Sequence, residues 1–326
     1  MLYYKHPHSF VENMSKTFWI IDTDAGVDDC QAIILALTSP EIEVLAITTV
    51  AGNVNLPQVL KNTAEAIKIS NKPIPFYVGA ERPLISTLVS AENIHGSDGL
   101  NNYWQSHSPS NLPNPEQKSA AQAIIDLSKQ YTNNINIVTI GPLTNLALAV
   151  ALDPDLPNRF NRVVVMGGAV HANGNRSVVS EFNIWCDPEA SYMVLERFPL
   201  IEMVPWETCI DPDHQFSLEF LHDYKSGRSP AGDFINQITK LHEGRSSVFF
   251  CDPVTLCICI DPSIVLKSTT TDCHIELSGS FTRGMTVVNW KKSDEAEVNA
   301  LKKRNVKIVE KLDTKKIMEL FLRSIQ

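Results

Sequence analysis

The sequence predicts an α/β fold in which a single open, mostly parallel β-sheet is flanked by helices. Short runs of β-branched and apolar residues alternate with segments of helical periodicity from the start of the chain. At this spacing, successive strand, helix and strand units form right-handed crossovers, which build a parallel sheet covered on both faces. The 326-residue chain is 44% hydrophobic, which excludes a mostly disordered chain, a collagen-like repeat or a coiled coil.

Each predicted strand is a short run of mainly apolar and β-branched residues, as expected for strands buried on both faces. In chain order the strands are Thr17–Asp22, Ile42–Val50, Ile74–Val78, Ile135–Ile140, Arg162–Met166 and Leu200–Val204. The helices between them are Asp28–Leu37, Pro57–Ile69, Ser119–Gln130, Leu143–Ala151 and Pro188–Arg197. The second helix shows its period clearly, with apolar residues at Val59, Leu60, Ala64 and Ile67. A polar stretch, Ser86–Glu116, interrupts the alternation after the third strand.

The last third of the chain is a less regular mixture of helical and β-rich segments. The predicted helices are Asp233–His242, Pro253–Ile260 and one that closes the chain, and the β-rich stretches are Cys273–Leu277, Gly284–Trp290 and Val306–Glu310. No Ser/Gly-rich linker and no internal repeat divides the sequence. We therefore expect a single domain at residues 16–326, preceded by a poorly ordered N-terminal extension at residues 1–15.

The charge balance argues against nucleic acid and membranes as partners. Asp and Glu number 37 against 28 Lys and Arg, so the net charge is −9, and the basic residues are scattered. No apolar run approaches the roughly 18 residues of a membrane span, and the N-terminus lacks the apolar segment of a signal peptide. The seven cysteines are odd in number and far apart, which indicates reduced thiols in a cytoplasmic protein.

The first predicted strand ends in a cluster of four carboxylates, Asp22, Asp24, Asp28 and Asp29. Carboxylates this close repel one another, and a hard cation such as Ca²⁺ or Mg²⁺ relieves that repulsion. Gly26 allows the tight turn that brings Asp24 back toward the start of the next helix. A simpler alternative is that Asp28 and Asp29 cap that helix, where negative charge is favoured. Capping does not account for all four carboxylates.

Further distinctive segments follow the later strands, where ligands bind in sheets of this kind. They are Thr48–Asn53 (TTVAGN), His95–Leu100 (HGSDGL), Gly141–Ala147 (GPLTNLA), Val164–Gly168 (VVMGG), Glu181–Ala190 (EFNIWCDPEA) and Cys251–Pro253 (CDP). Together with DTDAGVDD at Asp22–Asp29, their order and spacing resemble the inosine-uridine-preferring nucleoside hydrolase family. The resemblance extends from about Lys16 to the C-terminal helix.

The resemblance implies an enzyme that hydrolyses the N-glycosidic bond of ribonucleosides to ribose and free base, in nucleoside salvage. It also implies a calcium ion at the bottom of the cleft, held by Asp24, Asp29, Asp252 and the backbone carbonyl of Ile140. Many relatives have Thr at position 140, and the change should be harmless because only the main-chain oxygen is used. Asp24 would also be the general base that takes a proton from the attacking water.

The same resemblance implies a set of substrate-binding side chains. The hydroxyl-binding residues would be Asp28 and Asn183 at the ribose 2′ and 3′ positions, Asn53 beside the ribose, and Glu181 with Asn175 at the 5′ hydroxyl. Such contacts orient the sugar and can strengthen as positive charge develops in the transition state. Met166 and Phe182 would form an apolar floor near the sugar or, alternatively, belong to the core.

Position 251 departs from the common family pattern. Many members have His before the Asp-Pro pair, where it is thought to protonate the leaving base, whereas this chain has Cys251, a variant also found in the family. A thiol with a pKa of about 8.5 is a weaker acid at neutral pH than an imidazolium. His95 is therefore a second candidate for the leaving-group acid, although a lone His is more often structural.

Two features stay open at the level of sequence. Trp206, Phe249 and Phe250 either stack on the nucleobase or belong to ordinary core packing. The segment Ser226–Gly232 is rich in Ser, Gly and Pro, which suits a mobile lid.

Two rival functions are weaker. A HAD-type phosphatase also begins with D-x-D after a strand, but it requires a Thr where this chain has Gly26. A non-catalytic nucleoside or sugar binder is the second rival, raised by Cys251. The retained Asp24 argues against it, because binding alone needs no general base. Since oligomers are usual in the family, we expect a homodimer or homotetramer; no motif separates purine from pyrimidine substrates.

Overall fold

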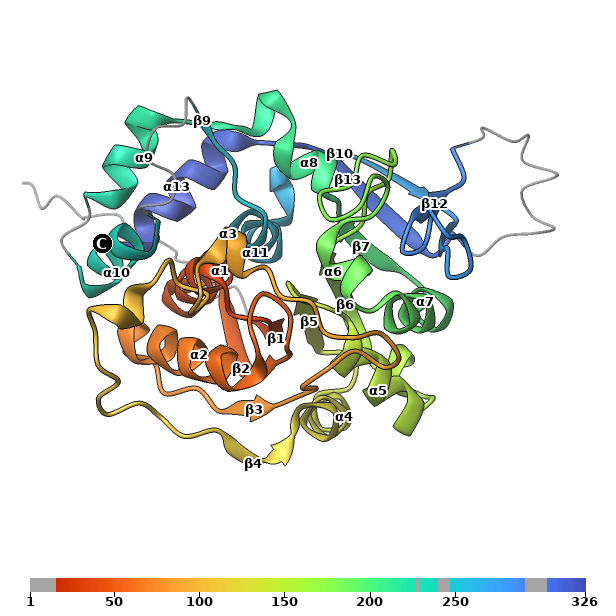
Figure 1. The fold of residues 1–326 in the computed structure, drawn as a ribbon, viewed down its shortest axis with the longest axis horizontal. Coiled ribbons are helices and arrows are strands. Elements are labelled where there is room, and N and C mark those ends of the chain that lie inside the picture. Colours follow the sequence, from red (N-terminus) through yellow and green to blue (C-terminus); the bar gives the residue numbers. More distant parts are fainter. Residues whose placement is uncertain (1–15, 227–228, 240–246, 291–303) are drawn as a thin grey trace, which may run out of the picture.

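A computed structural model describes residues 16–226, 229–239, 247–290 and 304–326. Its centre is an open nine-stranded sheet with the order β10-β13-β7-β6-β5-β1-β2-β3-β4 (Figure 1). The strands are β1 (Thr17–Thr23), β2 (Ile42–Thr49), β3 (Phe76–Val78), β4 (Glu116–Ser119), β5 (Ile135–Thr139), β6 (Phe160–Met166), β7 (Ile201–Val204), β10 (Val265–Thr271) and β13 (Val306–Leu312). Only β10 and β13 pair antiparallel within this sheet, so the predicted open, mostly parallel sheet is confirmed.

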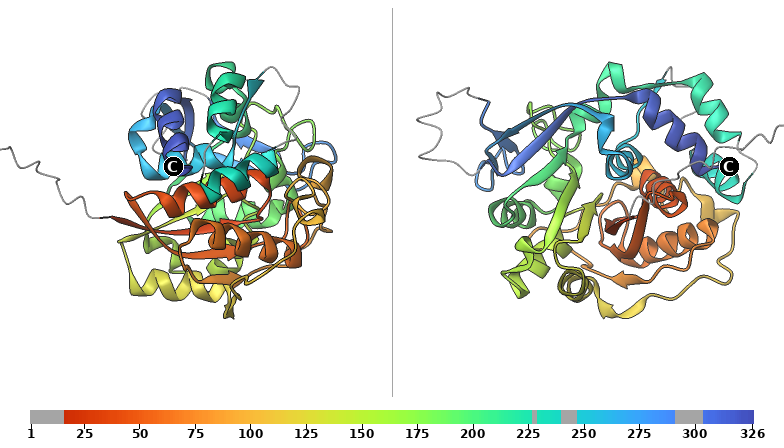
Figure 2. Two further views of the ribbon diagram at one scale, coloured as in Figure 1. Left: turned by 90° about the vertical axis from the view of Figure 1, so that its left-hand side faces the viewer. Right: turned by 180° about the vertical axis from the view of Figure 1, so that it is seen from behind.

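Helices cover both faces of the sheet (Figure 2). They are α1 (Val27–Thr38), α2 (Leu56–Ser70), α3 (Glu92–His95), α4 (Ala120–Gln130), α5 (Thr144–Leu152), α6 (Phe182–Cys186), α7 (Pro188–Arg197), α8 (Trp206–Ile210), α9 (Leu218–Lys225), α10 (Pro230–Ile238), α11 (Asp252–Ile260) and α13 (Thr314–Ser324). In β1, Trp19 and Ile21 enter the core formed with α1, α2, α11 and α13, whereas Ile20 enters the core formed with α4, α5 and α7. Burial on both faces explains why the strands are continuous apolar runs.

Two short antiparallel ladders lie outside the main sheet. They pair β11 (Cys273–Ile275) with β12 (Thr286–Val288), and β8 (Phe216–Ser217) with β9 (Ser247–Val248). None of the helices in the described ranges has both the length and the apolar character needed to cross a bilayer. The extension predicted at residues 1–15 lies outside the described residues.

The sequence prediction omits the two edge strands of the sheet. The residues of β4 are all exposed, and β10 is largely polar and contains no buried residue. Each edge strand has a neighbour on one side only and lacks the apolar run by which a buried strand is recognised. The short helices α3, α6, α8 and α9 are also absent from the prediction.

The helix predicted at Asp233–His242 begins earlier in the structure. Ser229 Oγ accepts a hydrogen bond from the Gly232 N–H at 3.1 Å, and Pro230 opens α10. A Ser cap followed by Pro is a strong helix start. Residues 230–232 of the lid predicted at Ser226–Gly232 therefore form the first turn of α10, while residues 227–228 lie outside the described residues.

Candidate active site

A cleft of about 510 Å³ opens where the carboxyl ends of β1, β2, β5 and β6 meet. The predicted site residues that line it are Asp28, Asn53, His95, Ile140, Met166, Asn175, Glu181, Phe182, Asn183, Cys251 and Asp252. The remaining two, Asp24 and Asp29, lie beneath this surface and are fully buried. The structure thus brings together residues that the sequence spreads over more than two hundred positions.

Asp29 organises the loop between β1 and α1. Its Oδ1 accepts hydrogen bonds from the Thr23 hydroxyl (2.6 Å) and the Asp24 N–H (3.2 Å). Its Oδ2 accepts from the Gly26 N–H (2.9 Å) and the Asn53 side-chain amide (3.0 Å). The bond from Gly26 caps α1, so the capping alternative accounts for part of the role of Asp29. It does not account for Asp24, which precedes the helix.

Position 26 requires glycine because a side chain would not fit there, and not because its backbone is left-handed. Its φ is −80°, whereas the left-handed residue of this turn is Ala25, with φ 37°. A Cβ at position 26 would lie 2.7 Å from both the Asn53 side-chain nitrogen and His95 Nδ1. The turn predicted at Gly26 is present, and it requires glycine because three segments of the chain pack closely at this position.

Asp24 carries a buried oxygen that no described residue contacts by a hydrogen bond. Its Oδ2 accepts from the Asn53 backbone N–H at 2.7 Å, while Oδ1 lacks a partner within the described ranges. Burial, followed by repulsion from Asp29, raises the pKa of Asp24 well above its usual range. Leaving a buried carboxylate oxygen unsatisfied is costly, so a cation or a reacting proton is the expected partner of Oδ1.

Three carboxylates converge at the floor of the cleft. One oxygen from each of Asp28, Asp29 and Asp252 lies within 4.8 Å of the other two. Burial raises the pKa of all three, and repulsion from neighbouring carboxylates adds to it at Asp29 and Asp252. A cation would relieve this repulsion, and an all-oxygen set of donors suits a hard ion. The residues therefore fit a metal ion.

Asn183 lines the cleft and forms hydrogen bonds to the carboxyl ends of β5 and β6. Its side-chain nitrogen donates to the carbonyl of Ile140 at 3.3 Å and to the carbonyl of Met166 at 3.2 Å. The Ile140 carbonyl oxygen and the Asn183 side-chain amide therefore lie next to each other. Met166 belongs to the hydrophobic core and also lines the cleft, so both alternatives for this residue apply.

Glu181 caps α6 from inside the cleft. Its Oε1 accepts from the Asn183 N–H (2.8 Å), and its Oε2 accepts from the N–H groups of Gly168 (3.0 Å) and Ile184 (3.2 Å). These donors favour the ionised form, but burial outweighs them and raises the pKa of Glu181 to about 7. Glu181 therefore changes charge near neutral pH.

Glu181→Gln is expected to unfold with a weaker pH dependence than the wild type. Because folding raises the pKa of Glu181, its protonated form stabilises the fold at acidic pH, and this contribution is lost as the pH rises through about 7. The shift corresponds to about 3 kcal/mol in the free energy of unfolding. Urea unfolding from about pH 5 to about pH 8 measures it. Identical pH slopes for the two proteins would contradict this role of burial.

His95 is held as a neutral ring. The Val27 N–H donates to Nδ1 at 3.2 Å, and the Asp28 carboxylate lies 3.8 Å from the same atom. Burial lowers the pKa of His95, and the negative charge of Asp29 offsets this only in part. Since Nδ1 accepts a hydrogen bond, the proton of the neutral ring lies on Nε2. His95 can donate a hydrogen bond into the cleft, but it is not a cationic acid at neutral pH.

Cys251 presents a neutral thiol to the cleft. The residue is 7% exposed, and the thiol of Cys209 lies beside its thiol. This contact and burial raise the pKa of Cys251 well above its usual range. The thiol therefore stays protonated at neutral pH, and it is a weaker acid than an ordinary cysteine.

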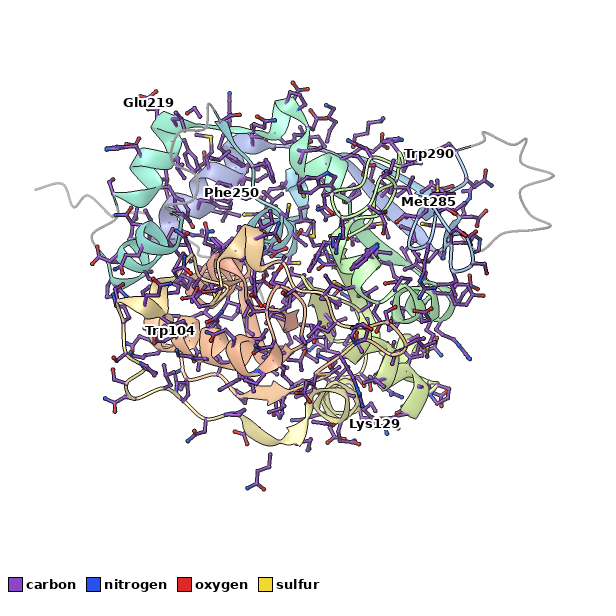
Figure 3. The ribbon with its side chains drawn as sticks, in the orientation of Figure 1. Trp104, Lys129, Glu219, Phe250, Met285 and Trp290 are labelled. Carbon is purple, nitrogen blue, oxygen red and sulfur yellow. The ribbon has the colours of Figure 1, made fainter. Side chains whose placement is uncertain are left out.

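The three aromatic candidates divide into two kinds. Trp206 and Phe249 are partly exposed in the cleft and pack edge to face, with ring centroids 5.2 Å apart. Phe250, which Figure 3 labels, is 2% exposed, and its ring packs edge to face on that of Phe321 with centroids 5.2 Å apart. Phe250 belongs to the core and reaches the edge of the cleft, whereas Trp206 and Phe249 are more exposed there and are placed to contact a ligand.

The cleft also contains residues that the sequence argument missed. Asn93 and Ile94 line it from α3, and Arg176 lines it from the loop after β6. The Arg176 guanidinium lies 4.0 Å above the Trp185 ring. Their residue types and spacing carry no signal, so only their position beside predicted residues could have indicated them.

Comparison with known proteins matches nearly the whole chain. The profile of the family described as inosine-uridine preferring nucleoside hydrolase matches residues 19–319. The chain is 36% identical to the inosine-uridine preferring nucleoside hydrolase of Leishmania major, over 83% of this chain and 87% of the relative. It is 32% identical to the pyrimidine-specific ribonucleoside hydrolase RihA of Salmonella enteritidis, over 83% of this chain and 88% of the relative.

A solved structure agrees with these sequence matches. An inosine-guanosine nucleoside hydrolase superimposes with a TM-score of 0.86 at 30% identity, covering 94% of this chain and 98% of that chain. These three proteins are named for the same class of reaction and for different bases.

Proposed function

The chain belongs to the inosine-uridine preferring nucleoside hydrolase family, and we propose that it hydrolyses the N-glycosidic bond of ribonucleosides with the aid of a bound calcium ion. The observation that carries the proposal is the convergence of carboxylates at the floor of a cleft of about 510 Å³. A non-catalytic nucleoside or sugar binder is less well supported. Binding alone gives no reason for the unpaired Asp24 oxygen.

The proposed calcium ligands are Asp24, Asp29, Asp252 and the carbonyl oxygen of Ile140. The three carboxylates whose oxygens lie within 4.8 Å of one another are those of Asp28, Asp29 and Asp252. We assign Asp24 to the ion because it is fully buried with an unpaired oxygen, and Asp28 to the ribose because it is partly exposed in the cleft. When bound, the ion would supply positive charge that offsets the carboxylates and acidifies a nearby water.

In the proposed reaction a water attacks C1′ of the ribose while the C1′–N bond breaks. The Asp24 carboxylate takes a proton from this water as the general base. The electron pair of the broken bond leaves with the nucleobase, which gains a proton from Cys251, from His95 or from solvent. The products are ribose and the free base.

The remaining residues of the cleft would orient the sugar. We assign Asp28 and Asn183 to the 2′ and 3′ hydroxyls, Glu181 and Asn175 to the 5′ hydroxyl, and Met166 and Phe182 to the apolar floor. Asn53 lies beside the ribose site, and its backbone N–H and one side-chain N–H hold the carboxylates of Asp24 and Asp29. The second side-chain N–H remains as a donor for the ribose.

Release of ribose from inosine, adenosine, guanosine, uridine and cytidine, with and without calcium, tests the function. Calcium-dependent release from at least one nucleoside is the expected result, and the ranking of the bases gives the specificity. Binding of nucleosides without any release would contradict the hydrolase and favour the non-catalytic binder.

Cys251→Ala is expected to slow natural nucleosides more than p-nitrophenyl riboside. General acids contribute about 10²–10⁴-fold, and the raised thiol pKa places Cys251 at the low end of that range. The nitrophenolate leaves without a proton, so its release should be nearly unchanged. Parallel kcat/KM measurements on His95→Ala identify which residue acts. Equal losses on both substrates would exclude Cys251 as the acid.

We further propose a cytoplasmic homodimer or homotetramer. The seven cysteines are free and buried, which supports a reducing compartment. We assign residues 16–326 to the catalytic domain and residues 1–15 to an extension. Size-exclusion chromatography with light scattering decides the oligomeric state.

A further inference from the structure

Glu207 lies in the first turn of α8, and its carboxylate accepts hydrogen bonds from a separate loop. The backbone N–H groups of Val170, His171 and Asn173 donate to it at 3.0, 2.8 and 3.5 Å. These three residues belong to residues 167–181, the long connection between β6 and α6. No step of the proposed reaction uses Glu207.

Three residues of the segment 167–181 line the cleft: Asn175, Arg176 and, at its end, Glu181. The segment contains no helix or strand, so its position depends on contacts with its neighbours. Asn175 Oδ1 accepts a hydrogen bond from the Phe182 N–H at 2.8 Å. The NH₂ group of Asn175 remains as a donor for a substrate hydroxyl.

Other contacts join the same segment to neighbouring elements. The Trp206 N–H donates to the Gly168 carbonyl at 2.9 Å, and the Trp290 indole N–H donates to the Val170 carbonyl at 3.1 Å. The His171 ring stacks on Trp290, which Figure 3 labels, with centroids 4.8 Å apart. Each of these contacts uses one backbone group or one ring. The carboxylate differs because it binds three N–H groups at once, and charge-assisted bonds are the stronger kind.

We propose that Glu207 is a positioning residue that holds residues 167–181 so that Asn175 meets the 5′ hydroxyl of the bound ribonucleoside. This role rests on the proposed function, in which Asn175 binds that hydroxyl. Trp206 and Glu207 are neighbours in α8, so this short helix positions both an aromatic side chain of the cleft and, through Glu207, residues 167–181. Loss of the carboxylate would leave three N–H groups without their acceptor and loosen the loop.

The kinetic test compares Glu207→Ala and Glu207→Gln with the wild type on the faster of inosine and uridine and on its 5′-deoxy analogue. We expect Glu207→Ala to raise KM for the complete nucleoside about tenfold with little change in kcat. On the 5′-deoxy analogue, kcat/KM should change less than about twofold, because the Asn175 contact is already missing. Glu207→Gln keeps an acceptor oxygen and should recover part of the loss.

Glu276→Ala is the matched control, because the Glu276 carboxylate also accepts two backbone N–H bonds, from Ser278 and Gly279, outside the cleft. Hydrogen exchange gives a readout that does not depend on turnover. Exchange at residues 170–173 should be faster in Glu207→Ala and unchanged in the control.

Two results would overturn the positioning role alone: equal losses of kcat/KM on both substrates in an active enzyme, or unchanged exchange at residues 170–173. A wild type that hydrolyses no nucleoside would contradict the proposed function and the positioning role together.

Discussion

Asp24→Asn is expected to lower kcat by roughly 10²–10⁴-fold while the protein remains folded. The substitution removes the proposed proton acceptor for the attacking water. It keeps an oxygen that can accept the hydrogen bond from the Asn53 N–H, and it removes one of the charges that repel Asp29 and Asp252. Ribose release at saturating substrate measures the loss, and thermal melting without calcium should show a melting temperature no lower than that of the wild type.

Asp153→Asn is the control for this experiment, because it makes the same chemical change outside the cleft. Asp153 accepts from Arg159 at 2.7 Å and lies 3.0 Å from the Lys129 ammonium. Its kcat should stay close to that of the wild type. If Asp24→Asn kept kcat within about threefold of the wild type, Asp24 could not be the general base. Excess calcium should not restore the activity of Asp24→Asn, which separates loss of the base from loss of the ion.

The acidic cluster could be predicted because its members are close in sequence. Asp24, Asp28 and Asp29 follow one strand, and the turn between strand and helix brings them together whatever the rest of the chain does. Asp252 comes from the first turn of α11, far along the chain, and only the family resemblance joined it to the others. Site residues that lie close together in the sequence could therefore be predicted from it, whereas contacts with residues far along the chain could not.

The contacts that hold the site were not predictable for the same reason. Glu207 accepts hydrogen bonds from backbone N–H groups, and any residue type except Pro supplies such a group, so its partners leave no trace in the sequence. The contact between Cys209 and Cys251 was not predictable either, because it depends on how α8 packs against the start of α11. The edge strand β10 was missed because its exposed residues lack the apolar run of the central strands.

Removing calcium is expected to abolish ribose release and to lower the melting temperature of the wild type. Burial and mutual repulsion raise the pKa of the clustered carboxylates, so their ionised forms destabilise the metal-free fold. An ion that binds only the folded chain adds about 2.7 kcal/mol when its concentration is a hundred times Kd. For a chain of this size that corresponds to an increase of about 4 °C in melting temperature. Calorimetry after EGTA treatment and after calcium is restored measures the difference.

The size of the calcium effect should depend on pH, with a sign fixed by the raised carboxylate pKa values. At low pH, protons neutralise these groups and stabilise the metal-free fold; this contribution is lost as the pH rises through the raised values. Calcium then takes the place of the protons, so its effect on the melting temperature should grow from about pH 5 to about pH 8. Asp252→Asn should reduce that increase, whereas Asp153→Asn should retain it. Identical melting temperatures with and without calcium at about pH 8 would contradict the calcium site, and an effect independent of pH would contradict the clustering of repelling carboxylates.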